Sequence, residues 1–250
     1  MKKNYENRTK VQLPRRTYTI IRIDGKAFHT YTKGCEKPFD IGLIEDMNAT
    51  AEYLCEKIQG AEIGFVQSDE ISILLTDFKT HQTDAWFDGN IQKIVSVAAS
   101  MATAKFNKLR MLRSMIKMEE NEISYSSDRY KLFKLAEFDA RTFTIPSKTE
   151  VMNYFIWRQQ DTVRNSISSV AQDLYSSDEL KGKNMTMQKE MIFQKGVNWN
   201  DYESTLKRGR FVFKEVYDKQ GAERTRWVAR GCPTFTENPE FLDLYISILD

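Results

Sequence analysis

The chain has few of the residues that build zinc sites and disulfide frameworks. It contains three cysteines, Cys35, Cys55 and Cys232, and only two histidines, His29 and His81. The cysteines show no Cys-x-x-Cys spacing and their number is odd, which argues against a disulfide framework and favours a reducing compartment. Two histidines also leave too few ligands for a Cys/His zinc site.

Long apolar segments and an excess of one charge are also missing. No run is long enough to span a bilayer, and the basic N-terminus lacks the apolar segment of a signal peptide. We therefore expect a soluble, cytoplasmic protein. The net charge is only +2, so the total does not indicate nucleic acid. Basic residues do cluster, at 2–16, 105–117 and 207–210, although such clusters are usually solvated faces.

The most informative stretch is Ile20–His29, whose β-branched front half is typical of a buried strand. Asp24 ends the strand, and Gly25 lets the backbone approach a ligand closely, which suits a metal and a phosphate. Asp-Gly is also an ordinary turn signal. The interpretation therefore depends on a second carboxylate pair, Asp69 and Glu70, which lies between two further apolar runs.

Hydrophobic periodicity predicts a β-α-β-β-α-β order up to Pro146. Strands are expected at 18–24, 63–66, 71–75 and 137–145, and helices from 41 to about 60 and from about 90 to 106. This order is typical of a ferredoxin-like α+β palm, in which the first and third strands are neighbours. In that topology Asp24 approaches Asp69 at one edge of the sheet.

A C-terminal elaboration of helices and a β-hairpin follows without a clear linker. The pattern predicts a long helix from the capping box at Ser147–Glu150 to about Leu174, a polar break at Ser176–Gly182, a helix at Thr186–Lys195, a hairpin of Arg210–Val216 and Glu223–Ala229, and a docked segment at 240–249. We therefore divide the chain into a catalytic palm domain, 1–146, and a second part, 147–250, packed on the palm.

Two carboxylates at the rim of such a sheet suit magnesium, a hard ion that keeps several waters for phosphates to replace. Asp24, Asp69 and the carbonyl of Gly25 would hold two ions, which align an attacking hydroxyl with a leaving phosphate. Glu70 is either a third ligand or a solvated turn residue, and we favour the ligand.

The loop from Gly25 to His29 would offer backbone N–H groups to phosphate oxygens, while Lys26 and Lys37 supply charge. His29 is expected to be packed and hydrogen-bonded, because phosphoryl transfer mostly needs positioning and charge neutralisation. Phe28 is expected in the core, with stacking on a nucleobase as the alternative.

These residues alone indicate a Mg²⁺-dependent enzyme acting on nucleotides, and two rivals stay open. A nucleotide cyclase can be built on the same palm, although it would not need the C-terminal half with its basic hairpin. A non-catalytic RNA-recognition module of the same topology needs exposed aromatic pairs on its central strands. The predicted strand at Ile71–Leu75 has no aromatic residue.

Several ordered motifs resemble those of the tRNA-His guanylyltransferase superfamily. They are Arg22–His29, Lys37–Asp40, Gln67–Ser72, Phe138–Arg141, Trp157–Asp161 and Asn198–Asp201. Members of that family are reverse polymerases, which add nucleotides in the 3′-to-5′ direction at the 5′ end of tRNA and assemble as tetramers.

The resemblance implies a homotetramer that binds tRNA, ATP and GTP and activates the 5′ end with ATP. It also implies that Asp24, the Gly25 carbonyl and Asp69 bind two Mg²⁺ ions, with Asp24, Asp69 and Glu70 as the catalytic set. The nucleoside triphosphate would be held by Asp24, Gly25, Lys26, Ala27, Phe28, His29, Lys37, Ser68 and Asp69.

One motif departs from the family pattern. Eukaryotic guanylyltransferases carry His-Ile-Asn-Asn where this chain has Val163-Arg164-Asn165-Ser166. The chain instead resembles the branch that repairs 5′-truncated tRNAs by templated addition, with guanylate addition to tRNA-His as the alternative. Candidate RNA contacts are Arg158, Asn165, Lys207, Arg208 and Arg210, with a helix-face structural role as the alternative for Arg158 and Asn165.

Overall fold

The computed structural model describes residues 1–120 and 134–248 of the chain. The strands are β1 (Tyr18–Gly25), β2 (Ala61–Gln67), β3 (Glu70–Leu75), β4 (Phe138–Ile145), β5 (Arg210–Lys219) and β6 (Ala222–Gly231). The helices are α1 (Phe28–Tyr31), α2 (Ile41–Lys57), α3 (Ile91–Glu120), α4 (Lys148–Leu174), α5 (Ser177–Leu180), α6 (Met185–Gln194), α7 (Ser204–Lys207) and α8 (Pro239–Asp243). Single 3-10 turns lie at η1 (Glu6–Thr9), η2 (Trp86–Gly89) and η4 (Trp199–Asp201).

The described strands form one six-stranded antiparallel sheet in the order β4-β1-β3-β2-β5-β6. This arrangement confirms the α+β class. It also confirms that the first and third strands are neighbours, since Ile23 pairs with Ile71. The hairpin of β5 and β6 is joined to the sheet edge where Arg210–Val212 pairs with Gly64–Val66.

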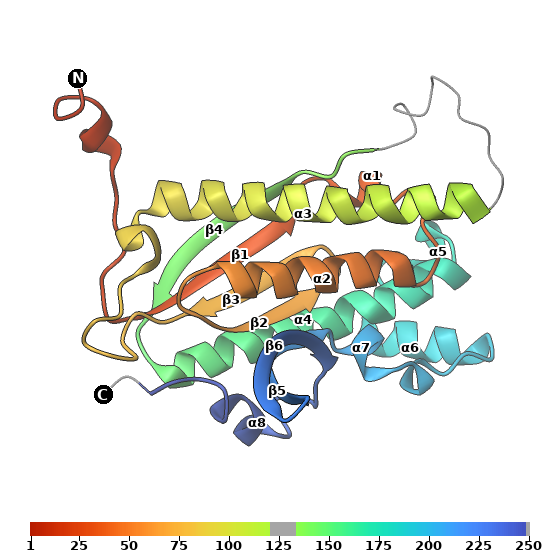
Figure 1. Cartoon of the computed structure of the whole chain (residues 1–250). Coiled ribbons are helices and arrows are strands. Elements are labelled where there is room, and N and C mark those ends of the chain that lie inside the picture. The colour runs from red at the N-terminus through yellow and green to blue at the C-terminus, as the bar shows by residue number, and fades with distance from the viewer. Residues whose placement is uncertain (121–133, 249–250) are drawn as a thin grey trace.

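Helices cover both faces of the sheet (Figure 1). Along β1, Ile21 and Ile23 pack against the apolar faces of α2 and α3, while Ile20 points to the opposite face. That second face is covered by α4, through residues such as Val151 and Phe155. Because the strand side chains alternate between the two cores, the central strands need apolar residues in succession, which explains their nearly continuous β-branched sequence.

Two helical predictions need correction. The second long helix was expected to end near Phe106, but α3 continues to Glu120. Its basic extension is held by Arg110 and Arg113, whose guanidinium groups pair with the buried carboxylate of Asp46 on α2. The predicted polar break after α4 also contains a helix, α5, which begins at a capping box made by Ser176.

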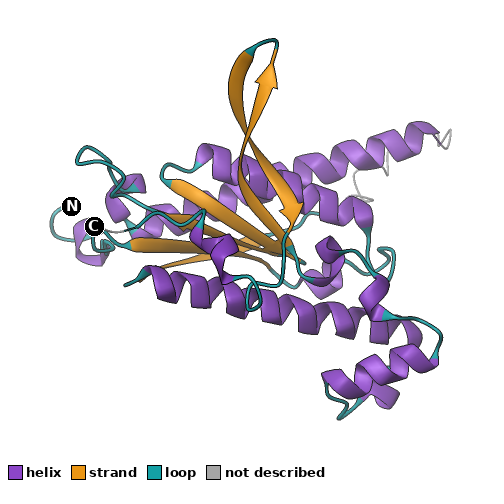
Figure 2. Cartoon of the chain, turned by 90° about the horizontal axis from the view of Figure 1, so that it is seen from below, coloured by secondary structure: helices purple, strands orange, loops and turns teal. Residues whose placement is uncertain are grey.

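Other C-terminal predictions are confirmed. Ser147 caps α4 by accepting a hydrogen bond from the backbone N–H of Glu150, and α4 ends at Leu174 as expected. The β5–β6 hairpin forms in register, and Figure 2 shows its outer part projecting beyond the rest of the molecule. The final segment docks through Leu242 and Ile246, which are buried beneath the sheet face that α4 covers.

Candidate active site

The two predicted carboxylates meet at one edge of the sheet. Asp24 follows Ile23 at the end of β1, and Asp69 lies in the tight turn before β3, so antiparallel pairing of these strands brings the two together. Both line one pocket of about 480 Å³. The predicted proximity of Asp24 and Asp69 is therefore confirmed.

Gly25 lies against the same carboxylates. A Cβ atom on this residue would stand 2.9 Å from Oδ2 of Asp69 and would also collide with the Phe28 ring. Only glycine therefore leaves the space beside Asp69 open for a ligand and lets the backbone reach it.

The electrostatics of the pocket favour a cation between the two acids. Burial, followed by the negative charge of Asp24, raises the pKa of Asp69 to about 6. Burial also raises the pKa of Asp24, with a second contribution from Asp139. Asp139 lies directly opposite Asp24 in the register of β1 and β4. Partly buried carboxylates that repel one another are stabilised when a bound cation neutralises them.

The oxygen-rich set fits magnesium better than a soft metal. Among the described residues, no cluster of three or more histidine, cysteine, aspartate or glutamate side chains is arranged to hold a metal ion. Asp24 and Asp69 supply two carboxylates, and the Gly25 backbone lies beside them. Such a small set is typical of Mg²⁺, which fills its other positions with water and substrate phosphate oxygens.

The two loops that carry the acids both contain a non-glycine residue in the left-handed region. Ala27 has φ +50° and Ser68 has φ +43°. Ser68 is exposed and borders three adjoining pockets, of about 480, 310 and 130 Å³. Strained backbone of this kind is common at ligand sites, because the surrounding structure holds it in place. The pockets together form a groove that extends from Asp24 toward Asp40.

The predicted triphosphate loop is only partly exposed to this groove. His29 was expected to be packed, but it is exposed and borders both larger pockets. Its Nε2 lies 3.1 Å from the Thr30 hydroxyl, and Lys37 borders one of the two pockets. The Phe28 ring is buried against Phe106 and Phe138, as expected for a core residue. The Lys26 ammonium pairs at the surface with Glu137, 2.6 Å away.

Glu70 borders the same pocket as Asp24 and Asp69, and its carboxylate is paired with a cation. Its side chain is buried, and its Oε2 accepts a hydrogen bond from Nη1 of Arg158 at 2.8 Å. Arg158 is itself 4% exposed and stacks over the Trp157 ring, 3.5 Å from the ring centre. Arg158 is therefore corrected from an RNA contact to the centre of a buried pair, while the role of Glu70 as a metal ligand stays a prediction.

The predicted basic RNA contacts also need correction. Arg210 is 4% exposed and donates from Nε to Asn48 at 2.8 Å, and Lys207 is 8% exposed with its ammonium donating to the Asn200 carbonyl. Both cations are held inside the fold, so neither presents its charge to RNA at the surface. Arg208 is half-buried and is the most accessible of the three. Asn165 borders the groove, as expected for a substrate contact.

Several groove residues were missed by the sequence reasoning. The polar face of α4 supplies Asp161, Ser168, Ser169 and Gln172 to the wall opposite Asp69. With Asn165 between them, these residues recur in steps of three and four, which is a detectable signal of one helix face. Such a polar face is usually interpreted as solvated. Asp139 lies in a recognised motif, and its effect on Asp24 follows only from the strand register.

Several solved and curated proteins similar to this chain are named as tRNA(His) guanylyltransferases or as proteins like them. A bacterial tRNA(His) guanylyltransferase-like protein in complex with ATP matches with a TM-score of 0.82 and 42% identity, covering 98% of this chain and 97% of the other. A bacterial protein of the same description in complex with GTP matches with a TM-score of 0.79 and 41% identity, covering 97% and 95%. The tRNA(His) guanylyltransferase of Debaryomyces hansenii is 26% identical over 84% of this chain and 78% of its own length.

These similarities identify the chain as a nucleotidyltransferase of the tRNA-modifying kind. A family model described as "tRNAHis guanylyltransferase" matches residues 1–146, more than half of the sequence. The chain belongs to the tRNAHis guanylyltransferase family, which confirms the resemblance seen in the motifs. Within residues 1–120 and 134–248, no helix combines the length and the apolar composition that a membrane crossing requires.

Proposed function

We propose that this chain adds nucleotides in the 3′-to-5′ direction to the 5′ end of truncated tRNA, using the opposite strand as template. The observation that carries the proposal is the convergence of Asp24 and Asp69 in one pocket of about 480 Å³, with Gly25 packed against Asp69. The order β4-β1-β3-β2, with helices between β1 and β2 and between β3 and β4, supports a ferredoxin-like palm formed by residues 1–146. ATP and GTP are bound by the two bacterial relatives and are the nucleotides that we propose here.

The chemistry would proceed in two transfers. A 5′-monophosphate end is first activated with ATP, which forms an adenylylated end and releases pyrophosphate; an existing 5′-triphosphate makes this step unnecessary. The 3′-hydroxyl of the incoming nucleotide then attacks the 5′ phosphorus, its proton is lost, and AMP or pyrophosphate leaves. Two Mg²⁺ ions, when bound, would neutralise the charge of the reacting phosphates.

The chain's own residues position the reactants. The carboxylates of Asp24 and Asp69 and the Gly25 carbonyl would hold the ions. His29, Lys37 and the exposed turn at Ser68 border the groove where the triphosphate would lie. Such positioning and charge neutralisation account for most of the catalysis in phosphoryl transfer.

A direct test is to incubate the protein with labelled nucleoside triphosphates, Mg²⁺ and a tRNA that lacks its first nucleotide. Growth at the 5′ end supports the polymerase. A cyclic product from the triphosphate alone would instead support the nucleotide cyclase, and RNA binding without turnover would support a recognition module. Every residue of β3 from Glu70 to Leu75 is buried, which leaves that central strand no exposed surface for base stacking and disfavours the module.

Templating gives a prediction of its own. Because Val163-Arg164-Asn165-Ser166 replaces the motif of dedicated guanylate addition, base pairing to the facing strand should select the nucleotide. Four truncated tRNAs that differ only in the facing base should each be extended preferentially with its complement, as judged by sequencing the products. Equal addition of guanylate to all four would support the tRNA-His activity instead.

Electrostatic capture of tRNA gives a further prediction, revised from the sequence-based one. Lys207 and Arg210 are buried, so the accessible cations to change are Arg208 and, on the projecting hairpin, Lys219 and Arg224. Changing these three to glutamine should weaken tRNA binding and reduce the slope of log K against log salt by up to about 3, since each lost phosphate contact removes about 0.9. Fluorescence anisotropy at several salt concentrations measures the slope.

The matched control is Arg226→Gln. This guanidinium is already paired with Glu215 at 2.6 Å, so its loss should change the slope less than the loss of Arg224. An unchanged slope in the triple variant would indicate that these three cations are solvated surface residues that do not contact tRNA phosphates.

A further inference from the structure

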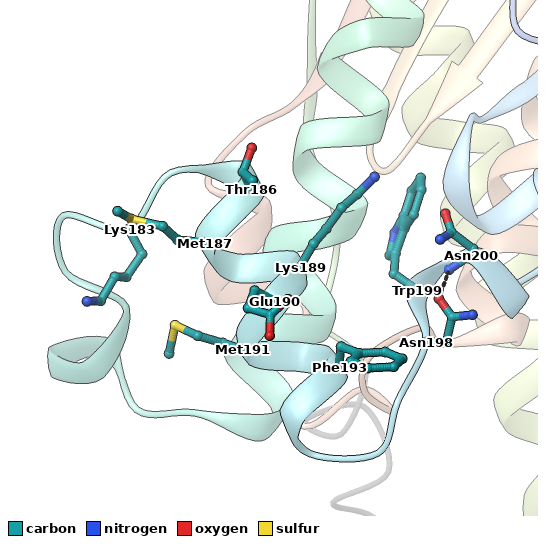
Figure 3. Close-up of a pocket in the computed structure, with 10 residues that line it drawn as sticks. All are labelled: Lys183, Thr186, Met187, Lys189, Glu190, Met191, Phe193, Asn198, Trp199 and Asn200. Carbon is teal, nitrogen blue, oxygen red and sulfur yellow. Dashed lines mark hydrogen bonds between the residues drawn. The ribbon is translucent and has the colours of Figure 1, made fainter.

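A second large pocket lies apart from the carboxylates. It has a volume of about 680 Å³ and is bordered by α6 and the η4 turn (Figure 3). None of its lining residues borders the groove around Ser68. The two sites are connected through α4, because the Trp199 indole N–H donates to Ser166 at 3.2 Å and the preceding residue, Asn165, borders the groove.

The pocket presents apolar side chains that the fold does not bury. Phe193 is 63% exposed and Met187 is 49% exposed. The helix is anchored by a different face, where Ile192 is fully buried against α4 residues such as Ile167. The Phe193 ring is therefore free to receive a flat ligand. Unpaired bases of RNA stack on exposed aromatic side chains of this kind.

The same region carries positive charge without a paired carboxylate. The Lys189 ammonium lies 4.1 Å from the centre of the Trp199 ring, and the Lys207 ammonium lies 5.4 Å from it. Among the residues described, neither ammonium forms an ion pair. Burial lowers the pKa of Lys207, and the positive charges of Arg208 and Lys189 lower it further. The Lys207 ammonium is held by the Asn200 carbonyl, so Lys189 is the cation available to a phosphate in this pocket.

One acid lies in the pocket as well, and it makes the site unsuited to a bare anion. The Glu190 side chain lies between Lys189 and Phe193 in Figure 3, and its Oε1 accepts a weak hydrogen bond from Gln194 at 3.3 Å. A carboxylate repels phosphate but accepts hydrogen bonds from the exocyclic amino group of a base such as cytosine. The combination of ring, carboxylate and lysine therefore matches a whole nucleotide.

We propose that the α6–η4 pocket binds one unpaired nucleotide of the RNA substrate, preferably one whose base has an amino group. The base stacks on Phe193, its amino group donates to Glu190, and its phosphate lies near Lys189. This inference rests on the proposed function, which supplies an RNA substrate on the other side of α4. The pocket would hold a single strand while the 5′ end reacts at Asp24 and Asp69.

Binding of a short fluorescent oligo(rC) to the full-length protein tests the pocket without any chemistry. Phe193→Ala should weaken binding by about 5- to 100-fold, the range expected for one lost base stack. Lys189→Gln should weaken it and flatten its salt dependence. Lys181→Gln is the matched control, because this exposed lysine precedes α6 without bordering the pocket, and binding should hardly change.

Base preference tests Glu190 separately. The wild-type protein should bind oligo(rC) more tightly than oligo(rU), which has no amino group, and Glu190→Gln should narrow that difference. Unchanged binding in Phe193→Ala would overturn the proposal. Displacement of the oligonucleotide by free ATP at a concentration equal to that of the binding sites would also overturn it, because it would indicate a mononucleotide site. A change in the sedimentation coefficient of the Phe193→Ala variant would overturn it as well, because it would indicate an interface between copies of the chain.

A failure of the pocket proposal can be distinguished from a failure of the catalytic proposal. Oligonucleotide binding that depends on Phe193, in a protein that fails to extend a truncated tRNA, would contradict only the proposed function. Extension of the tRNA by a protein whose binding ignores Phe193 would contradict only the pocket.

Discussion

Asp69→Asn should abolish nucleotide addition and at the same time make the metal-free protein more stable at neutral pH. Activity is lost because the change removes one of the two carboxylates proposed to hold the ions, and with it the charge that would hold Mg²⁺ beside the reacting phosphates. Stability rises because the charged form of Asp69 is disfavoured in the folded state, where burial raises its pKa to about 6.

The pH dependence follows from the sign of that shift. Below the unfolded pKa, near 3.8, Asp69 is protonated in both states and contributes no penalty. As the pH rises through about 6, the folded state must ionise a disfavoured group, and stability falls by roughly 2–3 kcal/mol relative to acid. In the variant this loss should be missing. Its Tm in chelator should exceed that of the wild type by about 4–10 °C at pH 8 and by less at pH 5.

Thermal unfolding in chelator and in Mg²⁺, together with a primer-extension assay, measures both effects. Mg²⁺ should stabilise the wild type at pH 8 and have little effect on Asp69→Asn. Asp173→Asn, at an exposed position on α4, is the matched control and should leave activity and Tm unchanged. Retained turnover in Asp69→Asn would reject the assignment of Asp69 as a metal ligand. A Tm below that of the wild type would reject the explanation that the charge of Asp69 destabilises the metal-free protein.

Arg158→Met should destabilise the protein by about 3–5 kcal/mol, because it leaves the buried carboxylate of Glu70 without its cation. Asp161, the other partner of Arg158, is one-third exposed and also pairs with Arg164 at 3.3 Å, so it tolerates the loss better. The double variant Arg158→Met/Glu70→Gln should recover much of the stability, since no buried charge is left unpaired.

Urea unfolding of the two single variants and the double variant gives the coupling energy. We expect the double variant to be clearly more stable than Arg158→Met alone. If the double variant is no more stable than Arg158→Met, the Arg158 guanidinium does not neutralise the Glu70 carboxylate as the 2.8 Å contact indicates. That result would favour Glu70 as a metal ligand.

The sequence predicts those features of the site that depend on local pattern. The β-branched run before Asp24, the glycine after it and the apolar runs around Asp69 each identify a strand end, and the element order then brings the ends together. The burial of Lys207 and Arg210 was not predictable in this way. A basic stretch such as 207–210 is typical of a solvated surface, and only the packing of η4, α7 and α2 around it encloses the two side chains.

Strand register and pairing between residues far apart in the sequence account for the other differences between the predicted and the observed structure. Asp139 was part of a recognised motif, but its position opposite Asp24 depends on which residues of β1 and β4 align. The length of α3 depends on Asp46, which lies on another helix and neutralises Arg110 and Arg113. In both cases the deciding partner is far away in the sequence, so no window along the chain contains the signal.

The β5–β6 hairpin is attached to the sheet only at its base, so its tip can change in evolution separately from the catalytic site. Three residues of β5 join the sheet, and beyond Val216 and Thr225 the two strands pair mainly with one another. Residues can therefore be inserted or deleted in matched pairs at the tip without shifting any strand that carries Asp24 or Asp69. The reach and charge of this arm can thus change while the strand pairing that positions the two carboxylates stays the same.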